Sequence, residues 1–151
     1  MSLINDRLKQ LNIVLPPAPA PAANYVPYVK SNKLIFVSGQ IPMLNGELVT
    51  GKIGKNIEIE DAKTAARLCG LAIVSQLNEA TDLDLDKIKR IVKLGGFVNC
   101  IDEFTQQPEI INGASDLMVE VFGDKGKHSR FAVGTNSLPR NVVVEIEAIA
   151  E

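Results

Sequence analysis

The sequence is poor in the residues and motifs that mark most catalytic and metal sites. It holds one histidine and two cysteines in 151 residues, and Cys69 and Cys100 have neither metal-ligand nor CxxC spacing. A single histidine excludes any site that needs two. GxSxG, Walker and HExxH motifs are also missing. The common serine-hydrolase, P-loop and zinc-protease signatures are therefore excluded.

Long apolar runs and an excess of basic charge are missing too. The net charge is −2, so no electrostatic footprint for nucleic acid is visible. No apolar run approaches the roughly 20 residues that span a bilayer. The first 25 residues carry charges and lack the apolar stretch of a signal peptide. We therefore expect a cytoplasmic protein with neither nucleic-acid nor membrane partners. Its cysteines are expected to be buried thiols, with a disulfide left open.

The patterning predicts one domain over residues 1–151. A short helix over residues 2–12 precedes the segment LPPAPAPA, which we expect to wrap, extended, across the surface. Three strands, a long helix over 57–80, a further strand, a helix beginning near Pro108 and strands at 130–135 and 142–150 follow. The order β-β-β-α-β-α-β-β favours an α+β fold, a mixed β-sheet with two helices packed on one face.

Apolar stripes at helical spacing mark the faces that these two helices should bury. In the first helix the stripe comprises Ala62, Ala66, Cys69, Ile73, Leu77 and Ala80. In the second it comprises Ile110, Ala114, Leu117 and Val121, with Ile111, Met118 and Phe122 beside it. The run DLDLDK between the first helix and the next strand lacks the glycine and terminal glutamate of a calcium loop, so it is interpreted as a solvated turn.

The last strand places charge where a buried strand should be apolar. Alternation puts Val144, Ile146, Ala148 and Ala150 on a core face, and Val143, Glu145, Glu147 and Ile149 on the other. Two interpretations remain open from this pattern. The second face could be a partly buried interface that contains a polar site. It could instead be a solvated face on which Glu145 pairs with Arg130 or Lys93.

Four segments together resemble the Rid family of reactive-intermediate deaminases, also called YjgF-like proteins. They are VPYVKSNKLIFVSGQIP, IVKLGGFVNCIDEF, INGASDLMVEVFG and SRFAVGTNSLPRNVVVEIEAIA. The resemblance implies a chorismate-mutase-like fold that assembles as a homotrimer with small-molecule clefts between neighbouring subunits. It also implies hydrolytic deamination of enamines or imines, such as 2-imino acids, without a metal or organic cofactor.

The resemblance also assigns roles by position. Arg130 matches an arginine that holds a substrate carboxylate, and Glu145 matches a glutamate that helps to place the attacking water. Tyr28, Ser38 and Gly39 match residues of the same cleft, and Asn112 matches a pocket asparagine whose spacing to Arg130 differs by one residue. The partner implied is a small carboxylate substrate.

The sequence departs from the family pattern around the arginine. Phe131 and Ala132 follow Arg130 where the family often has a small residue and then a cysteine, and His128 stands where proline or alanine is typical. His128 could be a ligand contact or a surface residue. A trimer that binds or senses a small carboxylate without chemistry is therefore an alternative to a deaminase. RNA cleavage is the least favoured function, because one histidine cannot supply an acid–base pair.

Overall fold

The computed structural model describes residues 2–151, and its main sheet has five strands in the order β1-β2-β7-β5-β6. Every neighbouring pair is antiparallel except β5 and β6, which run parallel and are joined through α3. A parallel pair requires such a crossover connection. The strands are β1 (Tyr28–Ser31), β2 (Leu34–Gln40), β5 (Ile91–Asn99), β6 (Ser129–Thr135) and β7 (Val144–Ala150). The mixed α+β sheet predicted from the sequence is confirmed.

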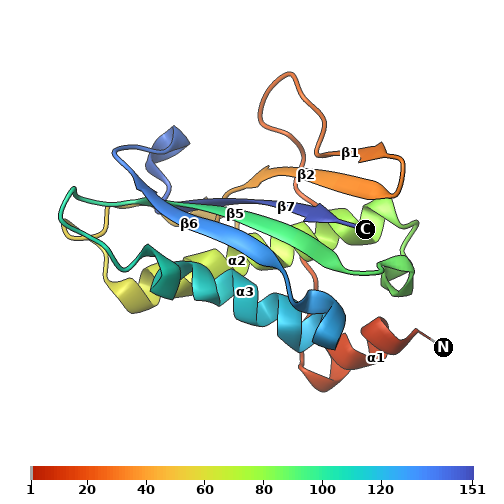
Figure 1. Ribbon diagram of the computed structural model, residues 1–151. Coiled ribbons are helices and arrows are strands. Elements are labelled where there is room, and N and C mark those ends of the chain that lie inside the picture. Colours follow the sequence, from red (N-terminus) through yellow and green to blue (C-terminus); the bar gives the residue numbers. More distant parts are fainter. Residues whose placement is uncertain (1) are drawn as a thin grey trace.

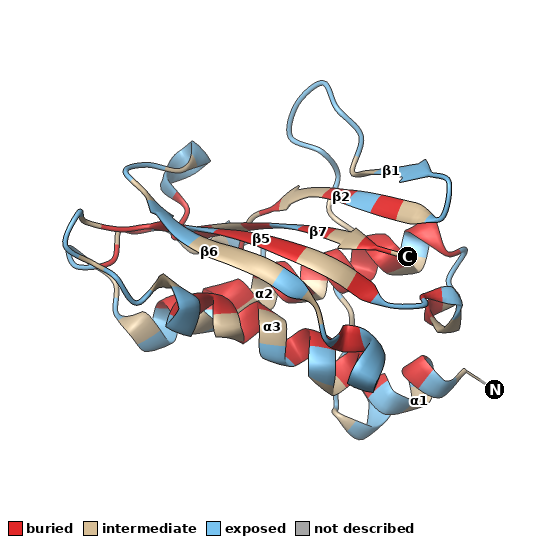
Figure 2. Cartoon of the chain, in the orientation of Figure 1, coloured by how far each residue is buried: buried red, intermediate tan, exposed pale blue. Residues whose placement is uncertain are grey.

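Two long helices, α2 (Ile59–Ala80) and α3 (Gln107–Phe122), cover one face of this sheet (Figure 1). All the residues of both predicted stripes are buried. The helices approach closely through glycine: a Cβ at Gly113 would collide with the backbone of Lys63, and one at Gly70 would lie 2.9 Å from Leu117. In Figure 2 the buried residues gather between the helices and the sheet. Cys69 and Cys100 are free and buried, so the thiol interpretation is confirmed.

The opposite face of the sheet, called the outer face below, is not covered by any helix of the described chain (Figure 1). The alternation of β7 is confirmed for its core side, since Val144, Ile146, Ala148 and Ala150 are all buried. Val143 precedes the strand, forms backbone hydrogen bonds with Val49 and Asn99, and is fully buried in the core cluster. It therefore adds no exposed apolar surface beside Glu145.

The remaining short elements lie at the edges of the fold. The Asn-Gly pair forms a small hairpin of β3 (Met43–Leu44) and β4 (Glu47–Leu48), apart from the main sheet. The helix α1 (Leu3–Gln10) lies beside α3. The proline- and alanine-rich segment then runs over α2, where Ser75 and Gln76 donate hydrogen bonds to the carbonyls of Pro16 and Pro19. These contacts confirm that the segment wraps the surface.

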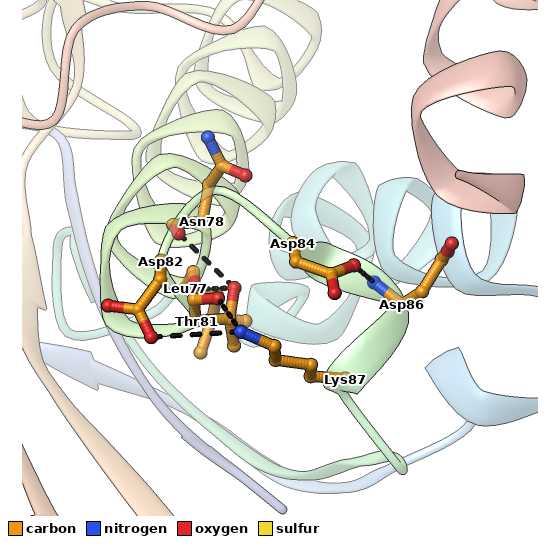
Figure 3. A network of polar contacts seen from close by, with 7 residues as sticks. All are labelled: Leu77, Asn78, Thr81, Asp82, Asp84, Asp86 and Lys87. Atoms are coloured by element: carbon orange, nitrogen blue, oxygen red, sulfur yellow. Dashed lines mark hydrogen bonds and ion pairs between the residues drawn. The ribbon is translucent and has the colours of Figure 1, made fainter. Parts of the chain in front are cut away.

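The DLDLDK run forms a turn at the end of α2, which contains the short 3-10 helix η1 (Leu85–Lys87) (Figure 3). Lys87 donates to the carbonyl of Thr81 at 2.9 Å and pairs with Asp82 at 3.7 Å. Asp86 points the other way and accepts bonds from the backbone N–H groups of Leu3 and Ile4, both at 2.9 Å. The turn therefore caps the start of α1.

Candidate functional site

Glu145 lies on the outer face of the sheet, directly against Gly39. In the register, β2 has two residues, Ser38 and Gly39, where β7 has only Glu147, which is a β-bulge. A Cβ at Gly39 would lie 3.1 Å from Cδ of Glu145 and closer still to its Oε1. Glycine at position 39 therefore leaves the space that the carboxylate fills. Burial raises the pKa of Glu145, and the charge of Glu147 adds to this effect.

Arg130 lies on the helix-covered face, at the edge of the sheet. On β6 it stands opposite Leu94 of β5, which is fully buried against the helices. Glu145 stands opposite Phe97 on the same strand β5. Leu94 and Phe97 are an odd number of positions apart on β5, so their side chains leave the sheet on opposite faces. Arg130 and Glu145 of one chain are therefore separated by the sheet.

The ion pair between Glu145 and Arg130 that one interpretation of the sequence required is consequently absent from the described residues, and Lys93 does not supply one either. Lys93 shares the outer face with Glu145, but its ammonium lies over the ring of Phe131, 5.3 Å from the centroid. Glu145 is half-buried, and among residues 2–151 the charge that shifts its pKa is that of another carboxylate, Glu147. The interpretation of this face as a set of solvated ion pairs is not supported.

The guanidinium of Arg130 is held by α3. Nη1 donates to Oγ of Ser115 at 3.0 Å, and Nη2 makes a longer bond of 3.4 Å to the carbonyl of Pro108. The other three of the five guanidinium N–H donors have no partner among residues 2–151. Arg130 is thus oriented by neutral groups and keeps donors free for an anion.

A cavity of about 490 Å³ lies between the ends of β5 and β6 and the start of α3. Gln107, which precedes the Pro108 that Arg130 contacts, and Gly134 both line it. A Cβ at Gly134 would lie 2.8 Å from Sγ of Cys100 and 2.9 Å from Nε2 of Gln107. Alternation places Arg130, Ala132 and Gly134 on one face of β6. Arg130 therefore lies on the same face of β6 as Gly134, which lines the cavity four residues further along the strand.

The other predicted site residues lie near Glu145, near Arg130, or apart from both. Ser38 is in the bulge beside Gly39, where its Oγ donates to the carbonyl of Val26 at 2.7 Å. Asn112 is half-buried on α3, and helical spacing puts it on the face that carries Pro108 and Ser115. Tyr28 stands opposite Val37 and packs on the core, so it shares the face of Arg130 and not that of Glu145.

Several residues near Arg130 were not predicted from the sequence. Ser115 and Gln107 had no motif to distinguish them, because their relation to Arg130 depends on how α3 lies along β6. His128 is half-buried rather than a surface residue. Its Nδ1 lies 2.6 Å from the carbonyl of Gly126, and its Nε2 lies 2.9 Å from Oγ of Ser115. The departure at position 128 was the only available signal for this contact.

The outer face around Glu145 is rich in exposed apolar side chains. Phe36, Phe97 and Val133 keep 41%, 39% and 42% of their surface exposed. Phe97 packs edge-on against Phe131, with ring centroids 5.3 Å apart. The register places all four residues on the face that carries Glu145. Several exposed apolar side chains on one face of a sheet are typical of an interaction surface.

Comparison with known proteins decides the family. Residues 5–151 match the family described as "YjgF/chorismate mutase-like, putative endoribonuclease". The chain belongs to this family. It is 47% identical to protein TCP17 of Trypanosoma cruzi over 146 residues, which cover 95% of this chain and 91% of that protein.

Solved structures of YjgF-like proteins share the fold. Protein Atu1372 of Agrobacterium tumefaciens aligns with a TM-score of 0.91 and 48% identity, covering 98% of this chain and 91% of that one. TdcF of Escherichia coli, whose crystal structure holds bound serine, aligns with a TM-score of 0.60 and 26% identity over 88% of this chain and 91% of its own. The resemblance of the sequence motifs to this family is therefore confirmed.

Two further features of residues 2–151 concern metal binding and membrane insertion. No group of three or more His, Cys, Asp and Glu side chains is arranged to hold a metal ion. None of the helices in the same range is long and apolar enough to cross a membrane.

Proposed function

We propose that this protein hydrolyses 2-imino acids, or the enamines in equilibrium with them, to 2-oxo acids and ammonia in a cleft between copies of the chain. The observation that carries the proposal is the separation of Arg130 from Glu145 by the sheet. A cleft between subunits can bring the arginine of one chain to the glutamate of its neighbour. The apolar outer face around Glu145 is a suitable surface for that contact.

Family membership makes the assembly a homotrimer in this proposal. Each sheet would direct its outer face toward the centre, where Phe36, Phe97 and Val133 would lose contact with water. Burying such side chains is favourable by about 25 cal/mol per Å². The edge of the sheet that carries Arg130 would then lie beside the Glu145 of the next subunit. Three equivalent clefts would result, each built from two chains.

Arg130 supplies the anchor for the substrate. Its three unpartnered N–H donors can take a carboxylate in two parallel charge-assisted bonds. Because the imine carbon is bonded to the carboxylate carbon, this anchor fixes the reacting atom as well. TdcF with bound serine supports an amino-acid-like ligand.

Glu145 of the neighbouring subunit moves the protons in the proposed reaction. Its carboxylate accepts a proton from water as the water oxygen bonds to the imine carbon, and the C=N π electrons pass to nitrogen. The protonated Glu145 returns this proton to the nitrogen, which gives a tetrahedral carbinolamine. Glu145 then takes the hydroxyl proton and passes it to the amine, the C–N bond breaks, ammonia leaves and the carbonyl of the 2-oxo acid forms. The raised pKa of Glu145 favours this role, because a carboxyl group that titrates closer to neutral pH can both accept and return a proton.

A carboxylate-binding trimer without chemistry is the second candidate. It is favoured by Ala132, which brings no polar group to a position where the family often has cysteine. RNA cleavage is not proposed, because the only histidine is engaged with Gly126 and Ser115 and the net charge is −2.

A coupled assay distinguishes the candidates. An amino-acid oxidase generates 2-imino acids in place, and their decay is followed with and without this protein. The deaminase function predicts faster decay with the wild-type protein and no acceleration with Arg130→Ala. If the protein accelerates the decay of no imino acid but binds a 2-oxo acid saturably, the deaminase function is rejected in favour of the binding trimer.

A further inference from the structure

Hydrogen bonds join three side chains in a row: His128, just before β6, Ser115 of α3 and Arg130 of β6. Nδ1 of His128 lies 2.6 Å from the carbonyl oxygen of Gly126. Nε2 of the same ring lies 2.9 Å from Oγ of Ser115, and this Oγ lies 3.0 Å from Nη1 of Arg130. His128, Ser115 and Arg130 are all half-buried, so these bonds are partly shielded from water.

The chemistry of the partners fixes the direction of each bond. A carbonyl oxygen can only accept, so Nδ1 of His128 must carry a proton. In a neutral imidazole Nε2 is then an acceptor, and the hydroxyl of Ser115 must donate to it. The lone pairs of Oγ then accept from the guanidinium of Arg130. Each group thus meets a partner of the opposite kind.

We propose that His128 and Ser115 are positioning residues that hold the guanidinium of Arg130 in the orientation that receives the substrate carboxylate. The inference deepens the proposed function and rests on it. Arginine is long and loses rotamer freedom when it binds, so an arginine that is already fixed binds an anion more tightly. The contact to Pro108, at 3.4 Å, is too long to fix the guanidinium alone.

The choice of a neutral partner matters for this role. A carboxylate in place of Ser115 would orient Arg130 equally well, but it would compete with the substrate for the guanidinium donors. A hydroxyl that is itself held by His128 orients the arginine and leaves its positive charge uncompensated. No carboxylate of the described residues forms an ion pair with Arg130. The side chains that touch the guanidinium therefore leave its charge available for an anion.

This row of bonds can be tested by NMR without any ligand, because His128 is the only histidine of the sequence. A protein labelled with ¹⁵N at histidine gives one imidazole spin system. At about pH 8, above the range in which histidines usually titrate, it should show the Nδ1–H tautomer. Ser115→Ala should shift the Nε2 resonance, since that nitrogen loses its hydrogen-bond donor. A wild-type spectrum of the Nε2–H tautomer would overturn the proposal.

The second measurement is the affinity for pyruvate, a simple 2-oxo acid, by titration calorimetry. Ser115→Ala and His128→Ala should each weaken binding roughly fivefold to tenfold. The double variant should be no weaker than the weaker single variant, because both changes interrupt one row of bonds. Ser115→Thr keeps the hydroxyl and should restore most of the affinity. Ser129→Ala is the matched control. Ser129 lies between His128 and Arg130 in the sequence, but its hydroxyl donates to the carbonyl of Val92 on β5 and takes no part in the row of bonds.

The outcomes separate this inference from the proposed function. Pyruvate binding that is unchanged in Ser115→Ala, or losses that add in the double variant, would overturn the positioning role while leaving the carboxylate site intact. A wild-type protein that binds no pyruvate would overturn the carboxylate site and the positioning role together. In that case an Nδ1–H tautomer would show that the three side chains serve only to join β6 to α3.

Discussion

Arg130 and Glu145 lie on opposite faces of one sheet. Their partners on β5, the strand between them, are Leu94 and Phe97 respectively. Neither residue can neutralise the other within a chain. This explains how an arginine and a glutamate can occupy the last two strands without forming a structural ion pair. Both are then free to act on a ligand, provided that a second subunit brings them together.

The stability of Arg130→Ala tests whether this arginine is structural. No ion pair is lost, and its contacts to Ser115 and Pro108 are with neutral groups. We expect the free energy of unfolding to change by no more than about 1 kcal/mol, while pyruvate binding is lost. Arg130→Lys should restore little binding, since an ammonium cannot form the planar fork. Lost stability with binding retained would make Arg130 a structural residue.

Gly39→Ala tests the packing between the bulge and the glutamate. The added methyl group would meet the side chain of Glu145, with its Cδ at 3.1 Å, so the carboxylate must move. Overpacking of this kind costs about 1–3 kcal/mol, and activity should fall further than stability. Activity equal to the wild type would show that the position of the carboxylate is unimportant.

The raised pKa of Glu145 makes a prediction about pH and stability. Above the unfolded value of 4.5, the folded chain keeps more of its protons on this group than the unfolded chain does. Stability therefore decreases as the pH rises through this window, and the penalty is complete above the folded pKa. Glu145→Gln should raise the melting temperature at neutral pH and flatten its dependence on pH above 4.5. Glu147→Gln should act in the same direction, but less. A melting temperature lowered at pH 7 by Glu145→Gln would contradict the assigned cause.

Asp86 fixes α1 through the backbone of Leu3 and Ile4, and these bonds lower the pKa of Asp86. Its contribution is complete above the unfolded value of 3.8 and is lost as the pH falls through the lower folded value. Asp86→Asn should increase hydrogen exchange at Leu3 and Ile4 at neutral pH, while the core strands stay protected. Asp84→Asn serves as the control, because Asp84 bonds only within its own turn. Equal exchange in the two variants would remove the capping role.

Local sequence patterns predicted the helices and strands, but not which residues face each other between neighbouring strands and helices. The alternation of β7 identified its core face, and the helical stripes identified both buried faces. The relation between Arg130 and Glu145 depends instead on two registers with β5, one parallel and one antiparallel. Nothing local in the sequence encodes a register, so an ion pair between the two residues remained possible. The contact of Ser115 with Arg130 depends likewise on where α3 lies along β6.

A shared cleft is tested most directly by mixing two inactive variants. Arg130→Ala retains Glu145, and Glu145→Ala retains Arg130, so co-expressed chains can rebuild complete sites between neighbours. Random mixing should restore roughly a quarter of the wild-type imine hydrolysis, because one cleft in four receives both intact residues. Native mass spectrometry verifies that mixed oligomers form. Mixed oligomers no more active than the separate variants would contradict a site shared between subunits.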